Sequence, residues 1–200
     1  MARTPRPEIR ISVDVEASGP SPSTGSLLSI GACLVDDLEE AFYRELQPLP
    51  DLPWDRTAER IHGLSRTRLA EQGLPPPTAM ADLAGWIGRV APEGTMPVFV
   101  GFNAPFDWMF VADYLHRFVG RNPFGYAALD LKAVYLGRHG IERWAETTKE
   151  HVRARYPVSL PHTHNALDDA RFQAMLARQL LAPEPGAAAV SDGEPSAAAG

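Results

Sequence analysis

The sequence predicts an α/β domain of three layers, in which helices cover a mixed β-sheet on both sides. Three strand-like segments follow one another near the N-terminus with short connections, which is typical of an antiparallel meander. The hydrophobic period then changes, and helical segments alternate with short strands through the rest of the chain. A length of 200 residues suits one such domain and provides a core that folds without disulfides or structural metals.

The meander is predicted from three segments. Glu8–Glu16 alternates apolar and polar residues with a period of two, as a strand with one buried face does. Leu27–Val35 is a short, nearly continuous apolar run and indicates a buried strand. Ala41–Leu46 follows the acidic turn DDLEE and is the third candidate strand.

Helices and strands alternate in the remainder of the chain. Thr78 is predicted to cap a helix whose apolar residues, from Met80 to Val90, recur at spacings of three and four. The elements predicted after it are a strand at Pro97–Phe102, a helix at Pro105–Val119, an extended stretch near Tyr126–Leu129, and helices over Leu131–Gly137, Glu142–Arg155 and Asn165–Leu181. One face of the last helix is predicted to contain Ala166, Ala170, Gln173, Ala174, Ala177 and Leu181.

Composition limits the class of protein. Residues 1–182 are predicted to form the domain, and residues 183–200, which are rich in Pro, Ala and Gly, are predicted to be disordered. The single cysteine, Cys33, excludes an internal disulfide framework and is predicted to be a core residue. The sequence contains no apolar run long enough to span a bilayer and no signal-peptide pattern at its start, so we expect a cytoplasmic protein without a membrane partner.

The net charge of −6 is unevenly distributed, and residues 183–200 account for half of it. The remaining acidic balance is unlike that of a typical DNA-binding domain. It suits an enzyme whose own carboxylates bind divalent cations.

Three groups of residues indicate chemistry. Asp14 and Glu16 end the first strand, and a period of two places both carboxylates on one face, with Cα atoms roughly 6.6 Å apart. Two such acids repel each other unless a hard cation lies between them, and oxygen ligands suit Mg²⁺ or Mn²⁺. A solvated acidic turn is the alternative interpretation of this spacing.

The second group is the segment GFNAPFD, in which Asp107 lies in the first turn of a predicted helix, where acids are also common as capping residues. The third is HTHNALDD, in which His164 precedes the last helix and an acid, Asp168 or Asp169, lies in its first turns. An imidazole beside a metal-activated water is a suitable general base. The alternatives are a surface histidine pair or, because His162 and His164 form an H-x-H pair, a zinc site.

The order of these groups resembles the DEDDh exonucleases, the DnaQ-like superfamily of the polymerase proofreading subunit and ribonuclease T. The resemblance covers roughly residues 8–181, and its spacing of five from the histidine selects Asp169 rather than Asp168. The segment IHGLS at 61–65 is similar to a family segment near the terminal nucleotide. The sequence departs from the family in the EASG turn at 16–19, where relatives often have Glu-Thr-x-Gly, and this leaves the nucleotide contacts near Ala17 and Ser18 open.

The resemblance implies a ribonuclease H-like fold with a five-stranded mixed sheet, and hydrolysis of phosphodiester bonds from the 3′ end of single-stranded DNA or RNA to nucleoside 5′-monophosphates. It implies two cations, Mg²⁺ or Mn²⁺, with Asp14 shared between them, Glu16 and Asp169 on the first and Asp107 on the second. It also implies that His164 is the general base. Some members of the family dimerise, so a homodimer is compatible with the resemblance.

Substrate contacts are expected close to these residues. The predicted contacts are Val15, Ala17, Ser18, His62, Asn103 and Phe106. The basic candidates for binding the strand are Lys132, Arg138, Arg143, Lys149, Arg153 and Arg155. The alternative function is a module of the same fold that binds nucleic acid or protein without turnover.

Overall fold

The computed structural model describes residues 5–160 and 164–183, and it contains a five-stranded sheet in the order β3-β2-β1-β4-β5. The strands are β1 (Glu8–Ala17), β2 (Leu27–Leu34), β3 (Ala41–Glu45), β4 (Met96–Gly101) and β5 (Ala128–Asp130). β1, β2 and β3 pair in antiparallel fashion, whereas β4 pairs in parallel with both β1 and β5. This confirms the predicted mixed sheet that begins with a meander.

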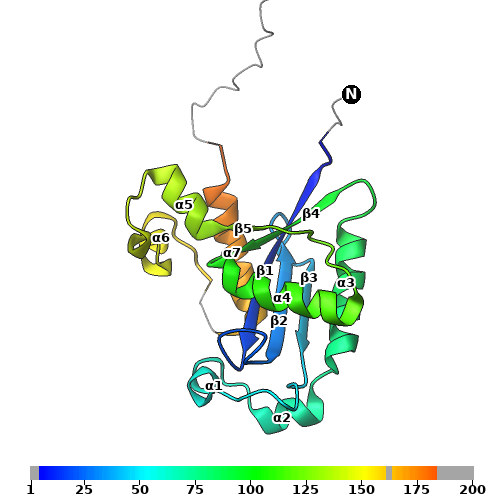
Figure 1. Cartoon of the computed structure of the whole chain (residues 1–200). Coiled ribbons are helices and arrows are strands. Elements are labelled where there is room, and N and C mark those ends of the chain that lie inside the picture. The colour runs from blue at the N-terminus through cyan, green and yellow to red at the C-terminus, as the bar shows by residue number, and fades with distance from the viewer. Residues whose placement is uncertain (1–4, 161–163, 184–200) are drawn as a thin grey trace, which may run out of the picture.

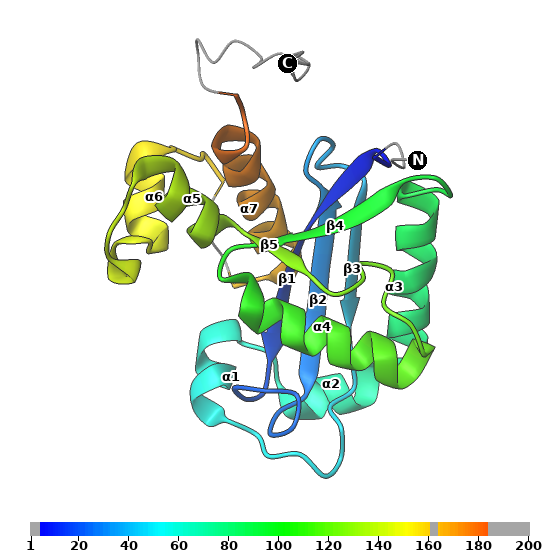
Figure 2. The same ribbon diagram turned by 45° about the horizontal axis from the view of Figure 1, so that its top comes forward.

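Helices lie on both sides of the sheet, as Figures 1 and 2 show. The longer ones are α3 (Pro76–Val90), α4 (Ala104–Val119) and α7 (Ala166–Leu180), and the shorter ones are α1 (Arg56–His62), α2 (Arg66–Gln72), α5 (Leu131–His139) and α6 (Lys149–Arg155). α3 and α4 share one hydrophobic core with β1, and α5, α6 and α7 contribute to a second core on the opposite face. The predicted three-layer architecture is therefore confirmed.

The period of β1 sorts its residues between the two layers. Ile11, Val13 and Val15 are buried in the core that contains α3 and α4. The residues between them face α7: the Ser12 hydroxyl donates a hydrogen bond to the carbonyl of Ala170, 2.8 Å away. The same alternation directs the carboxylates of the strand toward α7; the sequence predicts that they share one face.

α7 packs on the sheet at very short range because β2 has a glycine under its first turn. A Cβ atom at Gly31 would lie 2.2 Å from the carbonyl carbon of Ala166 and from the nitrogen of Leu167. Gly31 is also the cross-strand partner of Asp14. Only a residue without a side chain allows the start of α7 to approach the strand pair at this point.

Two predicted elements were wrong in their limits. α3 begins at Pro76 and not after Thr78, because prolines fit the first helical turn, and the carbonyl of Pro75 accepts the first hydrogen bonds of the helix. The helix predicted over Glu142–Arg155 is a 3₁₀ turn, η1 (Trp144–Glu146), followed by α6. It is interrupted because the Thr148 hydroxyl caps α6 by accepting from the backbone of His151.

α1 and α2 were not predicted from the sequence. Each has seven residues, too few for a periodic apolar stripe, and each depends on a cap from Asp55 or Ser65. Nearly all of the segment predicted to be disordered lies outside the described residues. Among residues 5–160 and 164–183, no helix combines the length and apolar character that a membrane span requires.

A carboxylate-rich candidate active site

One cavity opens where the C-terminal end of β1 meets the first turns of α4 and α7. It contains all five residues that the sequence analysis selected as catalytic. Its lining consists of Asp14, Val15, Glu16, Phe102, Asn103, Phe106, Asp107, Lys149, His164 and Asp169. Residues that are up to 155 positions apart in the chain thus meet at one point, as the hypothesis of a shared site requires.

β1 contributes the first two acids, and α4 contributes the third. Asp14 is 9% exposed and Glu16 is half-buried, and both lie on the face of β1 that α7 covers. Asp107 is 4% exposed, and its Oδ1 accepts a hydrogen bond of 3.0 Å from the backbone N–H of Val15. This bond connects the first turn of α4 to the strand between its two acids, so the three carboxylates are held together.

α7 contributes the fourth acid. Asn165 caps the helix, and its side chain accepts from the backbone of Leu167 and Asp168. Asp169 is 2% exposed and lines the cavity, whereas Asp168 is only half-buried and does not line it. Chemistry alone left the choice between these two acids open, and the structure places Asp169, not Asp168, in the cavity lining.

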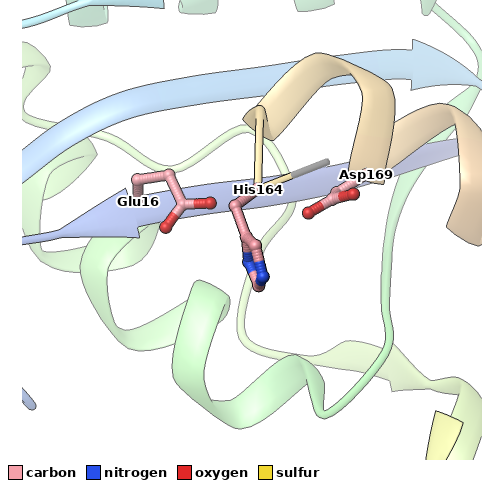
Figure 3. A group of neighbouring side chains, drawn as sticks. All are labelled: Glu16, His164 and Asp169. Carbon is pink, nitrogen blue, oxygen red and sulfur yellow. The ribbon is translucent and has the colours of Figure 1, made fainter. Parts of the chain in front are cut away.

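His164 lies just before α7 in a left-handed backbone conformation, with φ of 57°. A ring nitrogen of His164 and carboxylate oxygens of Glu16 and Asp169 all lie within 4.8 Å of one another. Figure 3 shows the imidazole between the two carboxyl groups. The other histidine of the H-x-H pair, His162, lies outside the described residues.

Burial makes Asp14, Glu16 and Asp107 difficult to ionise without a cation. Burial, followed by the charges of Asp107 and Asp169, raises the pKa of Asp14 well above its usual value. Burial, with the charges of Asp14 and Asp169, raises the pKa of Glu16 to about 8. Burial also raises the pKa of Asp107 to about 8, although its hydrogen bond from Val15 opposes that shift.

The residues present fit a hard divalent cation. Oxygen ligands predominate in the cavity, and a cation between the carboxylates would offset both the burial of these charges and their mutual repulsion. Lys149 is the one lysine or arginine among the described residues that line the cavity, and its charge lowers the pKa values of Asp14, Glu16 and Asp107. The donor set therefore matches Mg²⁺ or Mn²⁺.

Asp130, which was not selected from the sequence, fixes the turn between β4 and α4. Asn103 has a left-handed backbone, with φ of 66°. Oδ1 of Asp130 accepts hydrogen bonds from the backbone N–H groups of Asn103 (2.9 Å), Ala104 (3.3 Å) and Lys132 (3.2 Å). Asp130 thus holds the turn that precedes Asp107 while it caps α5. The sequence signal that could have identified Asp130 is its position directly before a predicted helix.

A second, more apolar cavity adjoins the first, and the two share Glu16 and Phe106. Its other walls include Ala17, Pro20, Ile61 and His62. Of the predicted substrate contacts, Val15, Asn103 and Phe106 line the carboxylate cavity, and Ala17, His62 and Phe106 line the apolar one.

Ser18 lines neither cavity. Its side chain is 1% exposed, and its hydroxyl accepts from the backbone N–H of Ser26 at 2.8 Å and donates to the carbonyl of Pro53 at 3.3 Å. These bonds give the Ser18 side chain a structural role in the turn after β1, and they do not support the predicted substrate contact.

His62 is fixed in one orientation. Its Nδ1 accepts a hydrogen bond of 3.0 Å from the backbone N–H of Leu64, so the proton of the neutral ring is on Nε2. Burial lowers the pKa of His62, which favours this neutral form. Nε2 has no hydrogen-bond partner among the described residues.

The structure distinguishes four of the six basic candidates by their contacts. Lys149 lines the carboxylate cavity. Arg138 instead donates to the carbonyls of Leu180 and Ala182 at the end of α7. Lys132 and Arg153 lie over the rings of Trp144 and Phe172.

Comparison with known proteins gives one family and one close relative. The sequence model of a family described as "3'-5' exoribonuclease Rv2179c-like domain" matches residues 9–181. The Escherichia coli protein "3'-5' DNA exonuclease Cap18" is 42% identical over 171 residues, which cover 86% of this chain and 90% of the relative.

Solved structures of low sequence identity share the fold. The nuclease domain of 3'hExo, a DEDDh family member bound to rAMP, superposes with a TM-score of 0.71 at 12% identity, over 86% of this chain and 91% of that one. E. coli exonuclease I in complex with a dT13 oligonucleotide gives a TM-score of 0.65 at 17% identity, over 86% of this chain and 41% of that one. These structural likenesses show that the chain has the same fold as these exonucleases.

Proposed function

The chain belongs to the family of Rv2179c-like 3'-5' exoribonuclease domains and is a 3′-5′ exonuclease of the DEDDh type, and from this premise we propose how it acts. It removes nucleoside 5′-monophosphates one at a time from the 3′ end of single-stranded DNA or RNA, with the help of two divalent cations. The observation that supports this most strongly is the single cavity shared by Asp14, Glu16, Asp107, His164 and Asp169.

We assign the cations, Mg²⁺ or Mn²⁺, to the four acids: Asp14 is shared, Glu16 and Asp169 complete one site, and Asp107 contributes to the other. When bound, the cations activate the attacking water and neutralise charge on the phosphate and on the leaving 3′ oxygen. Ionised carboxylates are the ligand form, so Asp14, Glu16 and Asp107 must lose the protons that burial favours.

His164 is assigned as the general base. It is the exposed member of the cluster, and its ring lies close to both Glu16 and Asp169. Water attacks the phosphorus and its proton passes to the imidazole, while the bond from phosphorus to the 3′ oxygen breaks and that oxygen takes a proton from solvent to become the new 3′ hydroxyl. The flanking carboxylates orient the ring and stabilise the imidazolium that results.

The apolar cavity is assigned to the base of the terminal nucleotide. It adjoins the carboxylates through Glu16 and Phe106, and Ile61, which is 55% exposed, provides an apolar surface at its edge. Such contacts bind any base, because every base has an apolar face. Lys149, which lines the carboxylate cavity, is assigned to a phosphate oxygen of the strand.

The proposed class of substrate is a single strand with a free 3′ end. The relative from E. coli is named a DNA exonuclease, whereas the description of the family names an exoribonuclease. The test therefore includes both DNA and RNA substrates. Oligonucleotides of matched sequence in DNA and RNA, labelled at the 5′ end, are incubated with the protein and Mn²⁺. We expect a ladder that shortens by one nucleotide at a time and releases 5′-monophosphates.

Two variants make this assay specific. Asp14→Asn removes the shared ligand and is expected to abolish the ladder, while Asp51→Asn, an exposed acid outside the site, is expected to leave it unchanged. Equal shortening by wild type and Asp14→Asn would refute the proposed site. Retention of the oligonucleotide without any shortening would instead support the alternative of a binding module.

A further inference from the structure

Gln173 is a polar residue in the middle of the packed face of α7. Its side chain is fully buried, one helical turn after Asp169, among residues that are otherwise small and apolar. A buried amide is costly unless each of its ends has a hydrogen-bond partner.

Both ends of the Gln173 side chain have partners, and both partners belong to the site. Nε2 donates a hydrogen bond to Oδ1 of Asp14, near the C-terminal end of the central strand β1. Oε1 accepts a hydrogen bond of 2.8 Å from the backbone N–H of Phe102, at the end of β4. One side chain of α7 therefore connects the first acid of the site with the turn that leads into α4 and Asp107.

The chemistry of these partners fixes the direction of the amide. A backbone N–H can only donate, so Oε1 must face Phe102, and Nε2 must then face Asp14. Nε2 can only donate, so the Asp14 oxygen it contacts must act as an acceptor. This bond occupies one direction on Oδ1 and sets the rotation of the carboxylate, so the other oxygen positions of Asp14 remain available toward the cavity.

We propose that Gln173 is a positioning residue for catalysis: it fixes the orientation of the Asp14 carboxylate and couples it to the β4–α4 turn. The proposal rests on the assignment of Asp14 as a ligand of the cations in the proposed function. Outer partners that orient a ligand typically change metal affinity or activity by about 10- to 100-fold when they are removed.

The decisive comparison is between positioning and packing. Gln173→Met retains most of the volume but cannot form either hydrogen bond. If Gln173 positions Asp14, this variant binds Mn²⁺ about 10- to 100-fold more weakly, and kcat falls while KM for the oligonucleotide changes little. If Gln173 only fills space, the melting temperature changes, and Mn²⁺ affinity and kcat do not.

Binding of Mn²⁺ is measured without substrate, from the electron paramagnetic resonance signal of the free ion, and folding is checked by circular dichroism. Gln179→Met is the matched control, because Gln179 lies on the same helix and its amide donates to the carbonyl of Pro157 at the surface, away from the cavity lining. We expect this control to bind Mn²⁺ and to turn over like wild type.

A second variant covers the case in which Gln173→Met does not fold. Gln173→Asn retains an amide but is one methylene shorter, so it cannot reach Asp14 and Phe102 together, and weaker Mn²⁺ binding is again expected. Wild-type affinity in whichever variant folds overturns the role of Gln173 and leaves the proposed function intact. Failure of the wild-type protein itself to bind Mn²⁺ overturns the proposed function instead.

Discussion

Substitution of Gly31 by alanine tests how closely α7 must approach the sheet for the site to form. The added Cβ would lie 2.2 Å from two backbone atoms of Ala166 and Leu167, whereas ordinary contacts begin near 3.4 Å. The first turn of α7 must therefore retreat by about 1.2 Å, because the obstructing atoms are backbone and cannot rotate away.

The retreat is expected to displace side chains of the proposed site while the protein stays folded. Asp169 lies in the turn that moves, and His164 lies directly before it. A misplacement of about 1 Å costs about 100-fold in rate, so we expect kcat to fall by about that factor. Overpacking of this kind lowers the free energy of unfolding by about 1–3 kcal/mol, which leaves most of the protein folded.

The assay compares kcat on a labelled single strand for wild type, Gly31→Ala and Gly88→Ala, each at a temperature where melting curves show it folded. Gly88 is the matched control, because it lies in the interior of α3 and an added Cβ there meets no atom within 4 Å. Gly88→Ala is expected to gain up to about 1 kcal/mol of stability and to retain its activity. A folded Gly31→Ala variant with kcat within twofold of wild type would refute the argument.

Three further predictions concern charge in the site. In the metal-free protein, Glu16 and Asp107 keep protons up to about pH 8, whereas the same groups in the unfolded chain release them near pH 4. The stability of the folded protein should therefore fall as the pH rises between these values. A melting temperature in EDTA that is constant or rises from pH 5 to 8 would contradict this. Lys149→Met should strengthen Mn²⁺ binding, because a competing positive charge is removed. It should also lower kcat by about 100-fold, because the ammonium contacts the phosphate. Calorimetry measures the first effect and steady-state kinetics the second, and an unchanged kcat would exclude the contact with phosphate. His164→Ala should lower kcat by about 10²- to 10⁴-fold and change Mn²⁺ affinity far less; comparable losses of both would identify His164 as a ligand.

The sequence predicted the parts of the site that depend on local periodicity. Asp14 and Glu16 could be placed on one face because a strand has a period of two, and Asp107 could be placed at the start of a helix. The choice of Asp169 over Asp168 needed the spacing of a known family, because both acids fall in the same helical turn. In the structure, burial distinguishes them.

The supporting contacts could not be predicted, because they join elements distant in the chain. Gln173 was placed on the packed face of α7, but nothing in the sequence shows that Asp14 lies opposite it. Gly31 interrupts an apolar strand, and such an interruption is the signal of close backbone approach. α1, which contributes His62 and Ile61 to the apolar cavity, was missed because seven residues give no periodic pattern.

The most direct test of the account is anomalous diffraction from crystals of the protein soaked with Mn²⁺ and a nucleoside 5′-monophosphate. We predict two Mn²⁺ peaks about 3.5–4 Å apart. Both should be within coordination distance of Asp14, with Glu16 and Asp169 on one and Asp107 on the other. Absence of Mn²⁺ from this cavity at saturating concentration, in a protein that degrades oligonucleotides in solution, would contradict the assignment of the cations to these four acids.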